Sequence, residues 1–414
     1  MQPDVDPQVL IVGAGPAGLA AARALAERGV SDILVIDRDD APGGLPRFCH
    51  HPGFGLEYAR WPYSGPGFVK RLLRDIDGAN VRIECQTTLL ALKEGPVAKI
   101  VGPRLGLRHV RPRAIILATG IRESNRGNLA IPGGRAETGI FTSGQLQQLV
   151  ARKVALPDRL KSVAVIGTEH VAFSTIWTAR KAGLRIRAII GDEGRIMSFA
   201  PLATLASACG IQVMTSTFVR EIETQQGATT AIILQTPQGM QRLATDGLVF
   251  TGNWIPETAA LGGGPVMLDP ATGGPEIDQA MRTSALGIFA AGNVLHGVES
   301  SGWCANEGRH AGLMAARFLR GEIAGNQSDR RLDLSADIDF AVPQRWDGNA
   351  VAAGIPVNLR VNKDLRDRKL TLSVGPQLIW SGSRRSFMRK RRIALPRSVS
   401  ADQIPGRLRI EFIE

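Results

Sequence analysis

A glycine-rich turn near the start of the chain limits the possible folds more than any other feature. Residues 13–18 read GAGPAG, directly after the apolar run Gln8–Val12 and directly before a run rich in alanine and leucine, Leu19–Arg28. A strand, a tight turn and a helix in this order form the first half of a βαβ unit. The apolar run Ile33–Ile36 then predicts a second parallel strand, and Asp37 stands at its end.

The three glycines of this turn have separate roles in binding a dinucleotide. Gly13 allows the tight turn, Gly15 lets a pyrophosphate approach the backbone, and Gly18 lets the helix pack closely on the strand. The helix N-terminus adds N–H donors and partial positive charge, and Asp37 can accept hydrogen bonds from ribose hydroxyls. A glycine turn without a ligand is the competing interpretation. Strand, helix and acidic residue together favour a bound adenine dinucleotide, which we expect to be FAD.

The same strand–turn–helix–strand pattern recurs at Ser162–Ile190. The predicted fold class is therefore α/β, with two Rossmann-like nucleotide-binding domains. Short alternating runs separated by Gly, Pro and Asn follow residue 330 and predict a small C-terminal β-rich domain.

Domain boundaries follow from two buried runs that end in Thr-Gly, AIILATG at 114–120 and DGLVFTGN at 246–253. We expect the first run to end one segment of the FAD-binding domain and the second run to open another. That domain is then discontinuous, at 1–125 and 245–330, with an NAD(P)-binding-like domain at 126–244 and the C-terminal domain at 331–414. A chain of 414 residues suits two or three domains.

Charge is unevenly distributed along the chain. The formal net charge is +12, and residues 338–414 hold 15 Lys and Arg against 7 Asp and Glu. The run SRRSFMRKRR at 383–392 contains six basic residues and one Phe. It is read as the solvated face of a β-hairpin or as a docking surface for an acidic partner subunit. Nucleic acid is disfavoured because no nucleic-acid-binding fold and no aromatic stacking platform is recognisable.

The four cysteines form neither a CxxC pair nor a group with metal-ligand spacing, so no metal is expected. No apolar stretch is long enough to cross a bilayer, and no signal peptide precedes the first strand. The expected location is cytoplasmic.

Several longer motifs carry a family resemblance. The run TSALGIFAAGN at 283–293 resembles the TSxxGIFAAGD signature with which two-dinucleotide flavoproteins hold the ribityl chain of FAD, with Asn293 in place of Asp. The chain resembles the two-dinucleotide-binding flavoproteins related to glutathione and thioredoxin reductases. Within them it is most similar to the FAD/NAD(P)-binding subunits of multi-component glycerol-3-phosphate, opine and D-amino-acid (hydroxyproline-type) dehydrogenases. The segments that carry this resemblance are GAGPAGLAAARAL (13–25), GGLPRFCHHPGFGLEY (43–58), SGPGF (64–68), ATGIRESNRGNLAIPG (118–133), GIFTSGQLQ (139–147) and GNVLHGVESSG (292–302).

The motifs and the resemblance together predict the FAD-binding residues. These are Gly13, Gly15, Pro16, Ala17, Gly18, Asp37, Arg38, Gly44, Leu45, Thr119, Gly120, Gly292, Asn293, Ser301 and Gly302. The candidate catalytic residues are His50 and His296, which could tune flavin protonation or orient a substrate, and Arg47, which could stabilise charge on the reduced flavin. Ordinary packed or surface side chains are the competing interpretation for all three.

Three departures from the family pattern affect the predicted function. Glu169 stands where the second glycine of the second dinucleotide motif belongs, which opposes NAD(P) binding although Asp192 and a helix start remain. The missing CxxC opposes thiol–disulfide chemistry and favours Cys49 and Cys304 as small buried thiols. The resemblance to the opine and hydroxyproline type implies a C-terminal cysteine cluster for an iron–sulfur centre, but no cysteine follows Cys304, so such a centre would belong to a partner chain. A second flavin is likewise expected only on a partner chain.

The sequence therefore predicts an FAD-dependent oxidoreductase that is one subunit of a hetero-oligomeric dehydrogenase or oxidase. Its substrate would be a small polyol phosphate, amino acid or opine, and its electrons would pass to a partner or another acceptor. The alternatives are a free-standing NAD(P)H-dependent flavin reductase and a non-catalytic flavin-bearing scaffold subunit.

Overall fold

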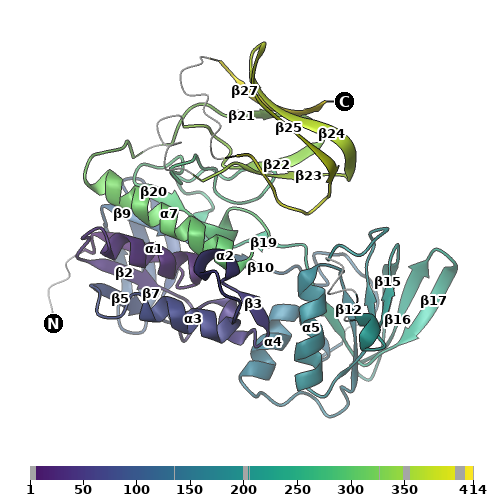
Figure 1. Cartoon of the computed structure of the whole chain (residues 1–414). Helices are drawn as coiled ribbons and strands as arrows, with labels where there is room; N and C mark the ends of the chain where they lie inside the picture. Colours follow the sequence, from purple (N-terminus) through teal and green to yellow (C-terminus); the bar gives the residue numbers. More distant parts are fainter. Residues whose placement is uncertain are drawn as a thin grey trace.

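The computed structural model describes residues 6–134, 136–198, 204, 206–325, 327–347, 355–396 and 406–413. It contains two α/β domains and a third domain built of β-strands (Figure 1). The predicted fold class is thereby confirmed.

The first domain is built on a five-stranded parallel sheet with strand order β20-β9-β1-β2-β5. Every residue of strands β1, β2, β9 and β20 is buried, which explains why they read as continuous apolar runs. The strands are β1 (Val9–Val12), β2 (Ile33–Ile36), β5 (Val81–Glu84), β9 (Ala114–Leu117) and β20 (Ile288–Ala290). Because β20 comes from far along the chain, this domain is discontinuous.

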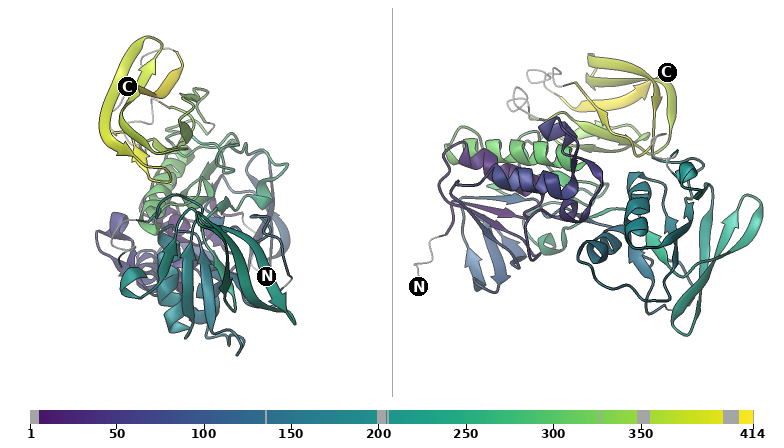
Figure 2. Two further views of the ribbon diagram at one scale, coloured as in Figure 1. Left: turned by 90° about the vertical axis from the view of Figure 1, so that its right-hand side faces the viewer. Right: turned by 60° about the horizontal axis from the view of Figure 1, so that its bottom comes forward.

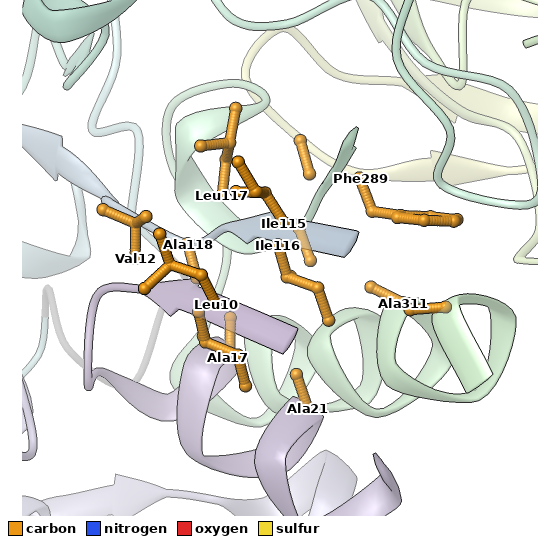
Figure 3. Close-up of a cluster of buried hydrophobic side chains, with 14 of the residues drawn as sticks. Leu10, Val12, Ala17, Ala21, Ile115, Ile116, Leu117, Ala118, Phe289 and Ala311 are labelled. Atoms are coloured by element: carbon orange, nitrogen blue, oxygen red, sulfur yellow. The ribbon is translucent and has the colours of Figure 1, made fainter. Parts of the chain in front are cut away.

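Two helices, α1 (Pro16–Ala26) and α7 (Ser301–Leu319), lie side by side on one face of this sheet (Figures 1 and 3). Side chains of β1, β9, β20 and both helices form the core shown in Figure 3. The two helices approach each other so closely that a Cβ atom on Gly308 would lie 1.9 Å from the backbone oxygen of Ala17. A Cβ atom on Gly312 would lie 2.5 Å from that of Ala21.

The other elements of the first domain flank the sheet. An antiparallel meander contributes Leu89 and Ile100 to the same core. The meander consists of β6 (Thr88–Lys93), β7 (Val97–Gly102) and β8 (Gly106–Val110). Between β2 and β5 lie η1 (Leu45–Phe48), β3 (Pro52–Phe54), α2 (Leu56–Ala59), β4 (Tyr63–Ser64) and α3 (Gly65–Arg74).

The second domain repeats this plan with strand order β11-β18-β12-β13-β14, again parallel. Helices α4 (Ser143–Ala151) and α5 (His170–Lys181) pack against each other beside this sheet. Its strands are β11 (Ile140–Thr142), β12 (Ser162–Ile166), β13 (Arg185–Ile190), β14 (Gln212–Met214) and β18 (Leu248–Phe250). An antiparallel sheet is formed by β15 (Phe218–Gln225), β16 (Ala228–Thr236) and β17 (Gly239–Ala244).

The start of the second FAD-domain segment differs from the prediction. Strand β18 pairs with β12 and β11, so residues 248–250 belong to the second domain and not to an FAD domain that resumes at 245. The sequence misleads here because each sheet has a buried strand that leads into Thr-Gly, β9 in the first and β18 in the second. The chain crosses between the domains at β10 (Ile121–Arg122) and β19 (Ile255–Pro256), which pair antiparallel.

The C-terminal domain has its own core, with Leu359, Leu372 and Phe387 among its buried residues. One sheet has the order β21-β27-β24-β25 and the other the order β22-β23-β26. Their bounds are β21 (Leu332–Leu334), β22 (Ile338–Val342), β23 (Asn358–Val361), β24 (Leu365–Val374), β25 (Gln377–Phe387), β26 (Ile393–Ala394) and β27 (Leu408–Ile413). This domain lies over α7 and extends toward the second domain (Figure 2, right).

No helix within the described ranges is long and apolar enough to span a membrane.

Candidate functional site

The turn after β1 has the conformation that a dinucleotide site needs. A Cβ atom on Gly13, whose φ is 107°, would lie 2.3 Å from the backbone oxygen of Ala118. A Cβ atom on Gly18 would lie 1.8 Å from the oxygen of Gly13. Gly15 caps the N-terminus of α1, Pro16 follows in its first turn, and a Cβ atom on Gly15 would meet nothing within 4 Å. The chain's own packing thus explains Gly13 and Gly18, whereas Gly15 leaves open space in front of a helix N-terminus.

Asp37 lies at the end of β2 and is tied to this turn. Its Oδ2 accepts a hydrogen bond of 2.6 Å from the Ala14 N–H, and its Oδ1 accepts one of 2.9 Å from the Asp39 N–H. Burial raises the pKa of Asp37, and the two backbone bonds oppose that rise. The neighbouring Arg38 forms an ion pair of 3.1 Å with Glu257.

The loop before η1 passes close to the same turn. Gly43 donates its N–H to the Ala14 oxygen at 2.8 Å. A Cβ atom on Gly44 would lie 3.2 Å from the Gly15 Cα. Leu45, the first residue of η1, is 36% exposed.

At the end of β9, Thr119 Oγ1 donates to the Glu257 oxygen at 2.8 Å and the Glu257 N–H donates to the Gly120 oxygen at 2.9 Å. The carboxyl ends of parallel strands meet at one edge of a sheet, so Thr119 and Gly120 lie at the same edge as the Gly13–Gly18 turn.

The side chain of Asn293 bonds to the backbone of Glu299 and so joins the two ends of the loop that leads into α7. Its Oδ1 accepts the Glu299 N–H at 2.7 Å, and its Nδ2 donates to the Glu299 oxygen at 3.3 Å. A carboxamide makes both bonds, whereas a carboxylate could only accept. This explains why Asn can stand where the flavoprotein signature has Asp.

Two buried polar groups beside this loop have no hydrogen-bond partner in the described part of the chain, Ser301 Oγ and Glu307 Oε1. The other oxygen, Glu307 Oε2, accepts the Gly292 N–H at 3.1 Å. Burial, reinforced by the nearby Glu299, raises the pKa of Glu307 to about 7. Native structures leave few buried polar groups unpaired, so these two are available to a polar ligand. Together with the open space at Gly15, these groups fit FAD.

The candidate catalytic residues contact different parts of the structure. Arg47 forms ion pairs of 3.1 Å with Asp39 and 2.9 Å with Asp40, so two carboxylates compensate its charge. His50 is exposed, and desolvation together with the charge of Lys181 lowers its pKa.

His296, by contrast, is 1% exposed, and its ring centroid lies 5.5 Å from that of Phe340 in the C-terminal domain. Neither of its ring nitrogens has a hydrogen-bond partner among the described residues. Burial lowers its pKa to about 4, so the imidazole is neutral at pH 7. The structure therefore does not gather the three candidates at one point, and their catalytic roles stay predictions.

All four cysteines are free, and Cys49 and Cys304 are buried. Burial raises the pKa of the Cys49 thiol to about 12 and that of Cys304 well above its ordinary value. Both side chains therefore stay protonated near pH 7, as expected of packed thiols. The described residues contain no cluster of three or more potential metal ligands.

Sequence reasoning missed a charged cluster at the start of α7. Glu299, directly before the N-cap Ser300, forms ion pairs with Arg360 of β23 and, at 3.4 Å, with Arg392. The Arg392 guanidinium lies 3.7 Å from the centroid of a Trp303 ring. No local motif marks this cluster, because its arginines follow Glu299 by 61 and 93 positions.

The second domain has the same turn with a different side chain. Glu169 caps the N-terminus of α5 with φ −76° and ψ 177°, against −77° and −174° for Gly15 at the start of α1. Its Oε2 accepts a hydrogen bond of 3.1 Å from Thr251 Oγ1, and a Cβ atom on Gly252 would lie 2.0 Å from its Oε1. The carboxylate thus occupies the space between the turn and the end of β18.

Comparison with known proteins places this geometry in a family. The family model described as pyridine nucleotide-disulphide oxidoreductase matches residues 7–315. The chain is 26% identical over 325 residues to a ferredoxin–NADP reductase of Ignicoccus hospitalis, covering 75% of this chain and 97% of that protein. It is also 26% identical over 340 residues to the glutamate synthase [NADPH] small chain of Azospirillum brasilense, covering 73% of this chain and 64% of that one.

A shorter match, 31% identical over 189 residues, is to one opine oxidase subunit of Rhizobium meliloti, covering 44% of this chain and 38% of that protein. Among solved structures, thioredoxin reductase of T. acidophilum shares the fold, with a TM-score of 0.63, 20% identity and coverage of 76% of this chain and 98% of that one. The chain spans less than two thirds of both the glutamate synthase small chain and the opine oxidase subunit. The chain belongs to the pyridine nucleotide-disulphide oxidoreductase family and is an FAD-binding oxidoreductase.

Proposed function

We propose that this chain is the FAD-carrying subunit of a multi-subunit dehydrogenase or oxidase. The substrate would be a small polyol phosphate, amino acid or opine, and the electrons would leave to a partner subunit or another acceptor. A cytoplasmic location belongs to the same proposal. The observation that carries it is the Glu169 carboxylate, which fills the place where a second dinucleotide would bring its pyrophosphate to the backbone. The proposal agrees with the match to an opine oxidase subunit.

Each part of the first site has a defined task in this proposal. The Gly13–Gly18 turn binds a pyrophosphate, and Asp37 orients a ribose. The first N–H groups of α7, beside Ser301 and Gly302, stabilise negative charge that develops near them. Glu307, with its pKa at about 7, can hold a proton on Oε1 near neutral pH. FAD, when bound, supplies an acceptor of two electrons that can release them singly or as a pair.

A free-standing NAD(P)H-dependent flavin reductase is the second candidate. The match over 97% of a ferredoxin–NADP reductase favours it. The two candidates differ in one measurable property, which is whether NADH or NADPH reduces the flavin of the isolated chain.

The test uses the purified, FAD-loaded chain under anaerobic conditions. NADH and NADPH are added separately, and the absorbance of the oxidised flavin is followed by stopped flow. We expect no reduction or very slow reduction. Rapid bleaching by either nucleotide would replace the proposal by the reductase.

A second experiment examines partners. The chain is isolated from native extract, and co-eluting proteins and cofactors are identified. We expect further dehydrogenase subunits and reduction of the flavin by a polyol phosphate, amino acid or opine in that complex. A chain that elutes alone and ignores these substrates would contradict the proposal.

A further inference from the structure

The basic run of the C-terminal domain divides into two parts. Residues 383–387 lie in β25, which pairs with β24, as expected of a hairpin. The remaining residues 388–392 form a loop between β25 and β26, here called the basic loop. Its side chains contact the second dinucleotide-binding edge, where the carboxyl ends of β12, β13 and β18 meet.

Two glutamates of that edge form ion pairs with the basic loop. Arg389 Nη1 lies 2.9 and 3.1 Å from the two carboxylate oxygens of Glu193, and Lys390 Nζ lies 3.3 Å from Glu193. Lys390 Nζ also lies 4.0 Å from Oε1 of Glu169, the residue that occupies the turn. The glutamate side chains are 20% exposed, so water screens these pairs only in part.

Asp364, in the turn between β23 and β24, fixes the base of the basic loop. It accepts the Arg389 N–H at 2.7 Å. It also forms a two-pronged ion pair with Arg195 of the second domain, with distances of 2.8 and 2.9 Å. The side chains of the basic loop thus contact the second domain directly, and its backbone is linked to that domain through Asp364 and Arg195.

The position of Glu193 gives these contacts a functional meaning. In the first domain, Asp37 follows β2 and faces the glycine turn through its bond with Ala14. In the second domain the residue directly after β13 is Gly191, and Glu193, two residues farther along, pairs with the basic loop. Ligands of a Rossmann-type sheet bind outside the carboxyl ends of its strands. Here two cations of the same chain are held at that edge by Glu193 and Glu169.

We propose that Arg389 and Lys390, together with Glu169, determine the electron donor by closing the second dinucleotide site against NADH and NADPH. The basic loop acts as an internal plug. Glu169 blocks the approach of the pyrophosphate, and the two cations, paired with Glu193 and Glu169, cover the strand ends beside it. This inference rests on the proposed function, because it accounts for a flavin that is not reduced by pyridine nucleotides.

The test compares four variants of the full-length, FAD-loaded chain with the wild type. They are Glu169→Gly, the pair Arg389→Gln and Lys390→Gln, the triple variant that combines them, and the control pair Arg384→Gln and Arg385→Gln. The control removes the same number of charges from the same basic run. Arg384 and Arg385 form no ion pair with the second domain in the described part of the chain. NADPH affinity is measured by the fluorescence of bound NADPH, and flavin reduction is measured anaerobically by absorbance.

We expect neither binding nor reduction in the wild type and the control. Glu169→Gly and the pair Arg389→Gln and Lys390→Gln should each raise the NADPH affinity modestly, because a part-exposed ion pair contributes little alone. The triple variant should raise it most, by at least roughly tenfold. If the triple variant folds with unchanged FAD content and binds NADPH no better than wild type, the plug is refuted while the proposed function stands. If adding Arg389→Gln and Lys390→Gln to Glu169→Gly instead lowers the NADPH affinity, the basic loop binds the phosphates of NADPH and the plug is also refuted. Fast reduction of the wild type refutes the proposed function itself.

Discussion

Replacing Glu307 by Gln should make the protein more stable at alkaline pH. Glu307 belongs to α7 and is only 3% exposed. One oxygen accepts the Gly292 N–H, and the other has no partner among the described residues. Glu307→Gln keeps the acceptor for Gly292 and removes the buried charge, so it isolates the cost of ionisation.

The magnitude follows from the pKa of about 7 in the folded protein, against the ordinary value of 4.5. At about 1.4 kcal/mol per pH unit, ionising this carboxyl costs the folded state roughly 3 kcal/mol. A raised pKa means that the folded protein binds the proton more tightly than the unfolded chain does. The contribution to stability is therefore complete below pH 4.5, declines as the pH rises toward 7, and is lost above it.

Thermal unfolding by scanning calorimetry at pH 5, 7 and 8.5 measures this effect. Wild type and Glu307→Gln should unfold at similar temperatures at pH 5. At pH 8.5 the variant should unfold at a temperature higher by roughly 5–10 °C. Glu94→Gln, which changes an exposed carboxylate on the β6–β7 turn, is the control and should show no such difference. A Glu307→Gln variant that tracks the wild type at every pH would refute the reasoning.

Two further predictions concern the flavin site and the domain contact. Gly15→Val should fold normally, because a Cβ there meets nothing within 4 Å, yet lose FAD on gel filtration; Gly262→Ala, which gains only an ordinary contact, should stay yellow. A colourless but unfolded Gly15→Val would contradict the first prediction. Arg360→Ala should lower the free energy of unfolding by about 3 kcal/mol, because it removes a buried partner of Glu299. Arg409→Ala, which breaks exposed ion pairs with Asp333 and Glu411, should change it far less, and equal losses in a denaturant titration would argue against this account.

The sequence was most informative where one short segment satisfies a physical requirement alone. The Gly13–Gly18 turn and Asp37 are such a case, because strand, turn, helix and acidic residue follow one another directly. The boundary at residue 245 was wrong because a buried strand that leads into Thr-Gly fits either sheet equally well, and only the pairing of β18 with β12 decides between them.

Contacts between distant parts of the chain could not be predicted in the same way. The run at 383–392 was recognised as a possible docking surface for a partner, which stays a prediction. Three of its six basic residues, Arg389, Lys390 and Arg392, form ion pairs with Glu169, Glu193 and Glu299 of the same chain, which the sequence did not indicate. Charge alone does not identify a partner, because every exposed carboxylate attracts an arginine. The choice depends on where three separately folded cores bring the side chains.

The discontinuity of the first domain has a consequence for how this protein is made. A growing polypeptide leaves the ribosome from its N-terminus, and domains fold as units when their residues have emerged. Strands β1, β2, β5 and β9 emerge early, but β20 and α7 follow only after the entire second domain has been synthesised. The inserted domain can therefore finish first, while the N-terminal half still shows the apolar surface that α7 will cover. Chaperones that bind nascent chains should contact this half for longer than the inserted domain.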